Sequence, residues 1–410
     1  MILNERFFWL AFSAFPGVGP VRFALLLSHF GNAKKAWEAS TQDLLRINFG
    51  EVLTNKLDTF RREFSVEGYA KKVTDMGIAT LILTDEKYPK LLKQIPDPPF
   101  VLYVRGHRRA AEVGHENFFV PQFSREESQL SHKGKPARKD ANRKNFESSP
   151  QPSKAWNINK SIAVVGTRKV TSYGREVTWL LTQQLAAAGL TIVSGLALGV
   201  DAEAHKAAIE AGGKTIAVLG CGVDCCNPPS NRWLYDKIID GNGVIISEMP
   251  LSHEPNRGLF PARNRIISGL SLGVLVTEGA KDSGSLITAR NAAEQGREVF
   301  AVPGPITSSL SKGPTELIKK GAKLVTAAED ILEELNIKGS TSRTSSKGRN
   351  FDGATGEEKK IIQILENEPL NFDEIVRIIG WPAGTVGSLL SIMEIKGMVK
   401  NVGNNRYCLI

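Results

Sequence analysis

The stretch Ser161-Ile-Ala-Val-Val-Gly-Thr-Arg168 decides the fold, because an apolar run ends in a glycine and an arginine. A second unit of the same kind follows at Leu190–Asp201, where Thr-Ile-Val-Ser-Gly leads into Leu-Ala-Leu-Gly-Val-Asp. Buried apolar runs that end in glycine turns and open helices are typical of a parallel sheet whose loops hold phosphate. We therefore expect Ser161–Val325 to form the core to which the rest of the chain attaches.

Apolar runs and amphipathic segments alternate along this core. The expected strands are Ile162–Val165, Thr191–Ser194, Thr215–Leu219, Val244–Ser247, Val274–Thr277, Val299–Val302 and Lys323–Val325. The expected helices are Tyr173–Ala188, Val200–Ala211, Ser230–Asp240, Phe260–Gly269, Ser285–Gln295 and Gly313–Lys320, followed by Ala327–Leu335. The pattern predicts a doubly wound α/β sheet, which binds ligands at the carboxyl ends of its strands.

The segments before this core predict an N-terminal head and the first strands of the sheet domain. Residues 1–76 have helical spacing and predict an all-α domain. Within it, Phe15-Pro-Gly-Val-Gly-Pro20 resembles a helix-hairpin-helix or SAM-like module, in which exposed N–H groups suit a DNA phosphate. A tight hairpin without a ligand fits the same residues equally well. The sheet domain is expected over residues 77–335, beginning with strands at Gly77–Leu83 and Pro99–Arg105.

Two low-complexity stretches interrupt the pattern. Residues 108–160 are rich in Ser, Lys, Asn, Gln and Pro, which predicts a disordered insertion. Residues 336–354 predict a flexible linker. The tail, residues 355–410, reads as three helices and a hairpin and resembles a winged helix. Its basic and acidic residues nearly balance, so docking to a protein is at least as good an interpretation as binding to DNA.

Composition limits the function classes. The net charge is +9, but the excess lies in the two low-complexity stretches, and the core is nearly neutral. A DNA site in the core must therefore come from local geometry. No apolar run reaches the roughly 18 residues that a membrane helix needs, and the N-terminus lacks the order of a signal peptide. Cys221, Cys225 and Cys226 lack a paired Cys-x-x-Cys or a histidine partner. We expect reduced thiols in a cytoplasmic protein, with neither metal nor cofactor.

Three motifs that suggest catalysis do not have the necessary context. Gly213-Lys-Thr215 resembles the end of a nucleotide-binding loop, but it follows a helix and enters a strand. Gly269-Leu-Ser-Leu-Gly273 resembles a hydrolase nucleophile turn, with the same reversed context. Asp201 and His205 could form an acid–base pair on one helix, although internal hydrogen bonding explains them better. We therefore expect no catalytic residues.

After these catalytic motifs are excluded, the sequence still contains a set of loops that could bind an anionic polymer. All follow strands or open helices, so they should converge on one face of the sheet. The candidate binding residues are Gly166, Thr167, Arg168, Ser172, Ser194, Gly195, Arg263, Asn264, Arg265, Lys281, Ser283, Gly284 and Ser285. Glycine permits close approach, arginine pairs with phosphate, and helix N-termini supply N–H donors. Simple helix capping explains any one loop, but the convergence of all of them favours a ligand.

Eight motifs together resemble the DprA/Smf family of bacterial DNA-processing proteins. They are Ala163–Arg168, Ser172–Gly174, Ile192–Ala197, Val200–His205, Gly213–Gly220, Phe260–Arg265, Ser283–Thr288 and Ala301–Gly304. The resemblance implies an extended Rossmann-like fold between a helical head and a winged helix. It implies a protein without catalysis that binds and protects incoming single-stranded DNA, forms homodimers, and loads the RecA recombinase in natural transformation. It also implies phosphate contacts by Arg168 and Arg263–Arg265, and a dimer interface that includes Leu317 and Ile318.

Two other classes of function stay open at this point. Related Rossmann-like sheets bind and cleave nucleoside phosphates, and Glu278-Gly-Ala followed by Ser283-Gly-Ser is a distant echo of their glycine-rich sites. A scaffold whose winged helix binds a partner is the third possibility. The insertion at residues 108–160 and Cys225-Cys-Asn227 depart from the family's usual pattern.

Overall fold

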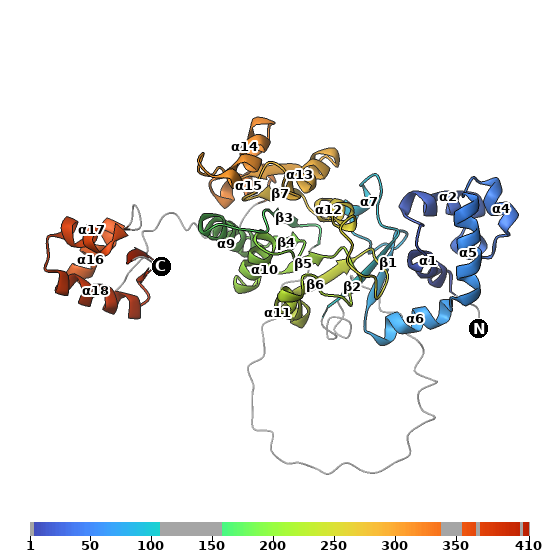
Figure 1. Ribbon diagram of the computed structural model, residues 1–410, viewed down its shortest axis with the longest axis horizontal. Helices are drawn as coiled ribbons and strands as arrows, with labels where there is room; N and C mark the ends of the chain where they lie inside the picture. Colours follow the sequence, from blue (N-terminus) through green and yellow to red (C-terminus); the bar gives the residue numbers. More distant parts are fainter. Residues whose placement is uncertain (1–3, 107–157, 338–354, 366–369, 402–404, 410) are drawn as a thin grey trace, which may run out of the picture. The chain divides into compact units, whose positions relative to one another are not determined.

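A computed structural model describes residues 4–106, 158–337, 355–365, 370–401 and 405–409. The chain divides into two compact units, Met1–Ser340 and Thr341–Ile410 (Figure 1). Nearly all of the predicted insertion and of the predicted linker lies outside the described residues.

The first unit contains a mixed sheet. In the described residues its strand order is β1-β2-β6-β5-β4-β3-β7-β8-β9. The bounds are β1 Ala79–Ile82, β2 Val101–Arg105, β3 Ser161–Val165, β4 Thr191–Ser194, β5 Thr215–Val218, β6 Gly243–Ser247, β7 Gly273–Val276, β8 Glu298–Ala301 and β9 Lys323–Leu324. Strands β3 to β9 are all parallel to one another, whereas β2 pairs antiparallel with both β6 and β1. Successive strands are added outward from β3 to β6, and the chain then crosses to β7 on the other side of β3. The order of strand addition therefore reverses between β3 and β7.

Helices cover both faces of this sheet (Figure 1). Side chains of β3 alternate between the faces: Ile162 and Val164 join one apolar cluster, and Ala163 and Val165 join another. The first face carries α9 (Ser172–Ala187), α10 (Val200–Glu210) and α15 (Ala328–Glu334). The second carries α7 (Lys90–Lys93), α12 (Leu259–Gly269) and α13 (Ser285–Glu294). Helices α11 (Arg232–Lys237) and α14 (Lys312–Lys319) complete this part of the unit. The predicted doubly wound α/β fold is confirmed.

The N-terminal head is helical, as its spacing predicts. Its helices are α1 Glu5–Ala14, α2 Pro20–Phe30, α3 Ala33–Glu38, α4 Thr41–Arg46, α5 Glu51–Glu63 and α6 Val66–Asp75. Polar side chains cap several of them: Asn4, Asn32, Ser40 and Ser65 each accept a hydrogen bond from the first turn. Such caps satisfy N–H groups that have no partner inside the helix.

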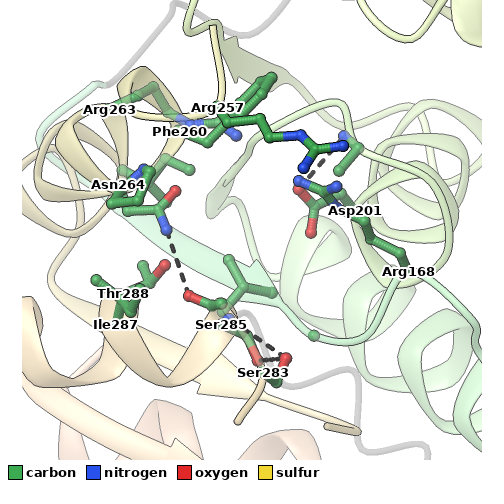
Figure 2. Close-up of a pocket in the computed structure, with 16 residues that line it drawn as sticks. Arg168, Asp201, Arg257, Phe260, Arg263, Asn264, Ser283, Ser285, Ile287 and Thr288 are labelled. Atoms are coloured by element: carbon green, nitrogen blue, oxygen red, sulfur yellow. Dashed lines mark hydrogen bonds between the residues drawn. The ribbon is translucent and has the colours of Figure 1, made fainter.

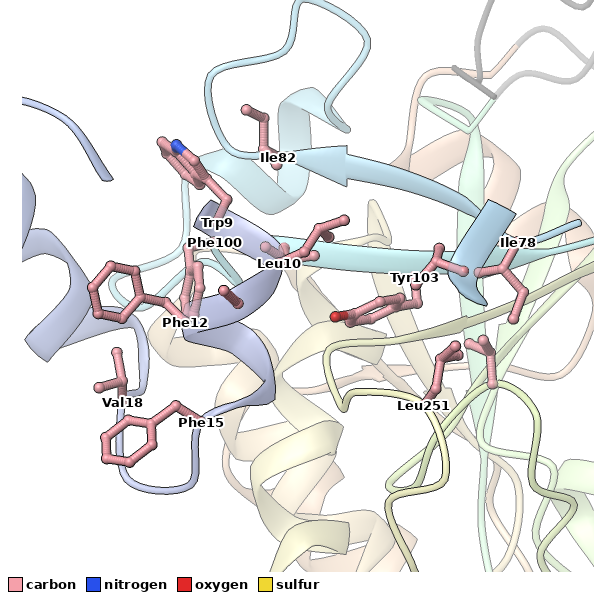
Figure 3. Packing of buried hydrophobic residues seen from close by; sticks show 14 of the residues in the cluster. Trp9, Leu10, Phe12, Phe15, Val18, Ile78, Ile82, Phe100, Tyr103 and Leu251 are labelled. Carbon is pink, nitrogen blue, oxygen red and sulfur yellow. The ribbon is translucent and has the colours of Figure 1, made fainter. Parts of the chain in front are cut away.

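The head shares one hydrophobic core with the antiparallel edge of the sheet (Figure 3). Phe23 of α2 stacks on Phe100, which precedes β2, with ring centroids 4.1 Å apart. Ser13 Oγ lies 2.6 Å from the Tyr103 hydroxyl, and the hydroxyl of Tyr69 donates to the same oxygen at 3.1 Å. The head is therefore part of the first compact unit, although the sequence predicts it as a domain of its own.

The second unit is the expected winged helix. Its helices are α16 Gly356–Leu365, α17 Phe372–Ile379 and α18 Ala383–Ile395, and its strands are β10 Leu370–Asn371, β11 Val399–Asn401 and β12 Arg406–Leu409. Asn371 and Glu374 form a reciprocal capping box at the start of α17, and Gly380 ends this helix in the left-handed conformation.

Within the described residues, no single helix is long and apolar enough to cross a membrane. The bent pair α17 and α18 meets the length and composition criteria only when both helices are taken together.

Candidate nucleic-acid interface

A cavity of about 580 Å³ lies at the carboxyl ends of the central strands, where the order of strand addition reverses between β3 and β7. Residues from the loops after β3, β4 and β7 line it, together with residues that precede and open α12 (Figure 2). The predicted binding residues in this lining are Gly166, Arg168, Arg263, Asn264, Ser283, Gly284 and Ser285. The structure therefore brings together loops that are far apart in the sequence, at the position where such sheets bind ligands.

Two exposed arginines lie at this cavity. Arg168 follows β3, and its guanidinium carbon lies 5.6 Å from the ring centroid of Phe260. Arg257 reaches the cavity from the loop before α12. The sequence reasoning missed Arg257 and the ring of Phe260, although an arginine just before a predicted helix start was a usable signal. An exposed guanidinium can pair with a phosphate in a bidentate way.

Three helices begin at or next to the cavity, and each has a glycine as its N-cap. The N-caps of α10, α12 and α13 are Gly199, Gly258 and Gly284, and none of them has a side chain that could accept from the first turn. Asn264 Nδ2 donates to the carbonyl of Gly284 at 3.3 Å, which joins α12 to the start of α13. The N–H groups of Ser285 and Leu286 already donate to the hydroxyl and the carbonyl of Ser283. The helix starts therefore favour an anion mainly through their partial positive charge.

Arg263 differs from the two exposed arginines, because it is buried. Its Nη1 donates to the carbonyl of Gly195 at 2.8 Å and to that of Val218. Its residue is only 5% exposed, and burial lowers its pKa to about 10, an effect that Asp201 partly offsets. Asp201 Oδ2 in turn accepts from the N–H of Gly195 at 3.1 Å, and burial raises the pKa of this carboxyl. The predicted phosphate contact by Arg263 is therefore replaced by a structural role in the loop after β4.

Arg265 lies outside the cavity lining and is held by carboxylates. Its Nη2 lies 2.7 Å from Glu248 Oε2, and its Nε lies 2.8 Å from Asp97 Oδ2. The arginine and glutamate side chains are 13% and 11% exposed, so this ion pair is largely buried. Burial raises the pKa of Glu248, although Arg265 opposes this effect. Arg265 thus connects α12 to the loops after β6 and α7, and it is not available to a phosphate as predicted.

The other predicted residues support the loops or lie beside the cavity. The N–H of Thr167 donates to the carbonyl of Glu278 at 2.7 Å, and Ser194 Oγ donates to the carbonyl of Val164 at 2.7 Å. Ser172 begins α9. Lys281 is exposed and lines a second cavity, of about 410 Å³, between α13 and α14. Thr167, Ser172, Ser194, Gly195 and Lys281 are absent from the lining of the first cavity.

Asp201 and His205 each have other hydrogen-bond partners. Thr215 Oγ1 donates its hydrogen to the carbonyl of Ile192 at 2.8 Å. His205 Nδ1 lies 2.6 Å from Thr215 Oγ1, so Nδ1 must be the donor of this second hydrogen bond. Burial, with a smaller effect of Arg263, lowers the pKa of His205 to about 3. The internal role suggested by the sequence therefore explains both residues better than acid–base catalysis.

The four cysteines, Cys221, Cys225, Cys226 and Cys408, are free thiols. Burial raises the pKa of Cys221 to about 12. A search of the described residues finds no cluster of three or more His, Cys, Asp or Glu side chains able to hold a metal ion.

Two family models match this chain. A family model described as DNA recombination-mediator protein A matches residues 153–336, and one described as the DprA winged helix domain matches residues 347–405. Protein Smf of Synechocystis sp. is 32% identical over 438 residues, which cover 99% of this chain and 99% of that protein. The chain belongs to the DprA/Smf family. The family resemblance carried by the eight motifs is thereby confirmed.

Further DprA/Smf proteins match parts of the chain. DNA processing protein DprA of Bacillus subtilis is 39% identical over 261 residues, covering 64% of this chain and 72% of that protein. The X-ray structure of DprA from Streptococcus pneumoniae aligns with a TM-score of 0.60 and 30% identity, covering 81% of this chain and 98% of that chain. The protein is thus a member of a DNA-processing family with the expected fold.

Proposed function

We propose that this protein binds single-stranded DNA along its backbone at the cavity defined by Arg168 and Arg257. The supporting observation is that these exposed arginines lie at the cavity where α12 and α13 begin. Guanidinium groups and helix N-termini both favour phosphate. Phe260 adds a ring on which an unpaired base can stack, and this favours a single strand over a duplex.

Binding of this kind is electrostatic and insensitive to base sequence. Each phosphate that an arginine neutralises releases counterions, so affinity falls as salt rises. We expect Arg168→Ala and Arg257→Ala each to weaken binding of labelled oligonucleotides of different sequence by the same factor. Each should also reduce the slope of log affinity against log salt by roughly one.

Fluorescence anisotropy across a salt series tests this site. Arg62→Ala is a matched control, because Arg62 is an exposed arginine of the head whose partner Asp58 also pairs with Arg61. Wild-type affinity and salt slope in both cavity variants would overturn the proposed site.

We further propose that the protein forms a homodimer, acts in the cytoplasm, and loads a RecA-type recombinase onto the incoming strand that it protects. The matched family model is described as a recombination mediator, which supports the loading role. Leu317 and Ile318 of α14 are half-buried, and Leu324 of the edge strand β9 is 44% exposed. Leu317→Asp is expected to give monomers in light scattering, and an unchanged mass would contradict the dimer. Recombinase filament assembly on coated oligonucleotide tests the loading.

The nucleoside-phosphate hydrolase alternative is weaker. Glu278, on which it depends, is buried, and its carboxylate accepts from the N–H and the hydroxyl of Thr171 at 2.9 and 2.6 Å. It is therefore engaged in holding the start of α9. Incubation with nucleoside monophosphates discriminates the two functions, since released base would support hydrolysis.

The winged helix is an unfavourable DNA reader. Helix α18, which holds the position of a recognition helix, has the sequence Ala-Gly-Thr-Val-Gly-Ser-Leu-Leu-Ser-Ile-Met-Glu-Ile, without a basic residue. Base and phosphate contacts usually need arginine or lysine. We therefore assign DNA binding to the first unit and a protein-docking role to the second. A pull-down with the Thr355–Ile410 fragment, compared with the rest of the chain, tests that assignment.

A further inference from the structure

An exposed tryptophan lies on α11, on a part of the surface to which the proposed function gives no role. Trp233 of α11 is 44% exposed. The Nζ atoms of Lys206 and Lys237 lie 5.2 and 5.5 Å from its ring centroid. We call Trp233, Lys206 and Lys237 the aromatic patch. An exposed aromatic ring between ammonium groups is the combination that binds a single strand, because bases stack on the ring and cations attract phosphates.

The aromatic patch is connected to the cavity through one residue. Asn231 Nδ2 donates to the carbonyls of Leu196 and Ala197 at 2.9 and 3.2 Å. Ala197 lines the cavity, and Trp233 follows Asn231 by two residues, a backbone length of at most about 7 Å. A strand that leaves the cavity past Ala197 therefore has only a short distance to cover before it reaches the ring.

The loop between the two places is shaped and held. Leu196 has a φ of 57°, an uncommon conformation for a residue with a branched side chain, and it is buried. Gly195, beside it, is held by Asp201 and Arg263, as described above. Leu198 on the same loop is 45% exposed, so an apolar side chain of this loop faces solvent. The loop that joins the cavity to Asn231 is thus held in one conformation.

The charges of the patch allow an anion to bind. Arg232 is committed to Asp236, with its Nε 3.0 Å from both carboxylate oxygens. Lys206 lies 3.1 Å from Glu203, whereas Lys237 has no carboxylate partner within the described part of the chain. Lys237 is therefore the ammonium group most available to a phosphate. A ring that served only to join α10 and α11 would be covered by them, and this ring is not.

We infer that Trp233 is a second subsite for single-stranded DNA, which stacks a base of the strand leaving the cavity while Lys237 contacts its phosphate. This inference rests on the proposed function and extends it, because it makes the binding site longer than the cavity. Oligonucleotides that fill only the cavity should not sense Trp233, and longer ones should.

Anisotropy with labelled oligo-dT of two lengths, about 5 and about 20 nucleotides, tests the inference. Trp233→Ala is expected to weaken binding of the long oligonucleotide about tenfold and to leave the short one unchanged. Trp233→Phe keeps a stacking ring and should stay within about twofold of wild type. Leu180→Ala is the matched control, because Leu180 is a 52% exposed apolar residue on α9. Trp233→Phe removes the fluorescence of Trp233. The long oligonucleotide should quench this tryptophan fluorescence in the wild-type protein and not in the variant.

Two results would overturn the inference. Wild-type affinity of Trp233→Ala for the long oligonucleotide would exclude stacking on this ring. Equal weakening for both lengths would show that Trp233 acts by supporting the Gly195 loop through Asn231. Arg168→Ala separates these results from the proposed function, since it should weaken both lengths. If Arg168→Ala behaves as wild type, the cavity site is wrong, whatever Trp233→Ala does.

Discussion

Asp201 and Arg263 hold the same residue, Gly195, by its two backbone groups. The carboxylate of Asp201 accepts from its N–H at 3.1 Å, and the guanidinium of Arg263 donates to its carbonyl at 2.8 Å. Both side chains are buried, so two groups of opposite charge fix the loop after β4 in addition to the apolar packing of Leu196. A buried pair of this kind is weak evidence for stability, but breaking it leaves an uncompensated charge.

Loss of Arg263 should therefore act first on stability. We expect Arg263→Ala to lower the free energy of unfolding by about 3–5 kcal/mol, because it leaves Asp201 buried without its counter-charge. Arg168→Ala should change it by less than about 0.5 kcal/mol, since that side chain is exposed. Urea unfolding of both variants measures the difference. Equal stability of the two variants would show that Arg263 is not the support assigned to it.

Arg265 gives a second prediction of the same kind. Arg265→Met should lower the unfolding free energy by several kcal/mol, because Glu248 then lies largely buried without its partner. The double variant Arg265→Met with Glu248→Leu should recover much of this loss. The salt slope of DNA binding should stay at its wild-type value in the folded fraction. If the slope of log affinity against log salt falls by about one, Arg265 contacts a phosphate, as the sequence predicts.

Two glycines of the cavity should respond differently to alanine. A Cβ on Gly166 would lie 2.6 Å from both the Glu278 carbonyl oxygen and Val200 Cγ2, so the end of β3 would have to move. We expect Gly166→Ala to cost about 1–3 kcal/mol and to weaken DNA binding. A Cβ on Gly284 meets no atom within 4 Å, and its backbone is already helical. Thermal unfolding of Gly284→Ala should match wild type, and equal destabilisation of both would contradict the close approach at Gly166.

His205 should make stability sensitive to acid. Its pKa is lowered to about 3 in the folded protein, against about 6.5 in an unfolded chain, so folding favours the neutral ring. This contribution is complete above pH 6.5 and is lost as pH falls toward 3, at up to about 1.4 kcal/mol per pH unit. His205→Gln should flatten the decline of unfolding free energy between about pH 6 and 4. Parallel declines in variant and wild type would rule out His205 as its source.

Much of the sheet could be predicted from the sequence. Runs such as Ile162–Val165 and Thr191–Ser194 are apolar on both faces, which is typical of strands covered by helices on each side. Glycines after these runs marked the loops, and the loops converge because parallel strands end on one edge. The motifs from which the family was recognised include the loops that lie at this edge.

The destinations of individual side chains could not be predicted. Arg168, Arg263 and Arg265 look alike in the sequence, yet only Arg168 faces solvent. The carbonyls of Gly195 and Val218 hold Arg263, and the carboxylates of Glu248 and Asp97 hold Arg265. These groups lie 17 to 168 positions away from the arginines and meet them only through the fold. Arg257 was missed because an isolated arginine in a loop carries no periodicity, and only its position just before a predicted helix start pointed to it. The docking of the head on β2 was likewise invisible, since both surfaces read as ordinary apolar cores.

The shared core of head and sheet has a consequence for biosynthesis. The head leaves the ribosome first, but its hydrophobic cluster also contains Tyr103, Tyr235, Ile245 and Leu251. More than half of the chain must therefore be made before the apolar surface of the head is fully covered. Until then, Phe23 and its neighbours lack the partner ring of a folded Phe100. The nascent chain thus exposes an aromatic surface for much of its synthesis, which is the condition that holding chaperones recognise.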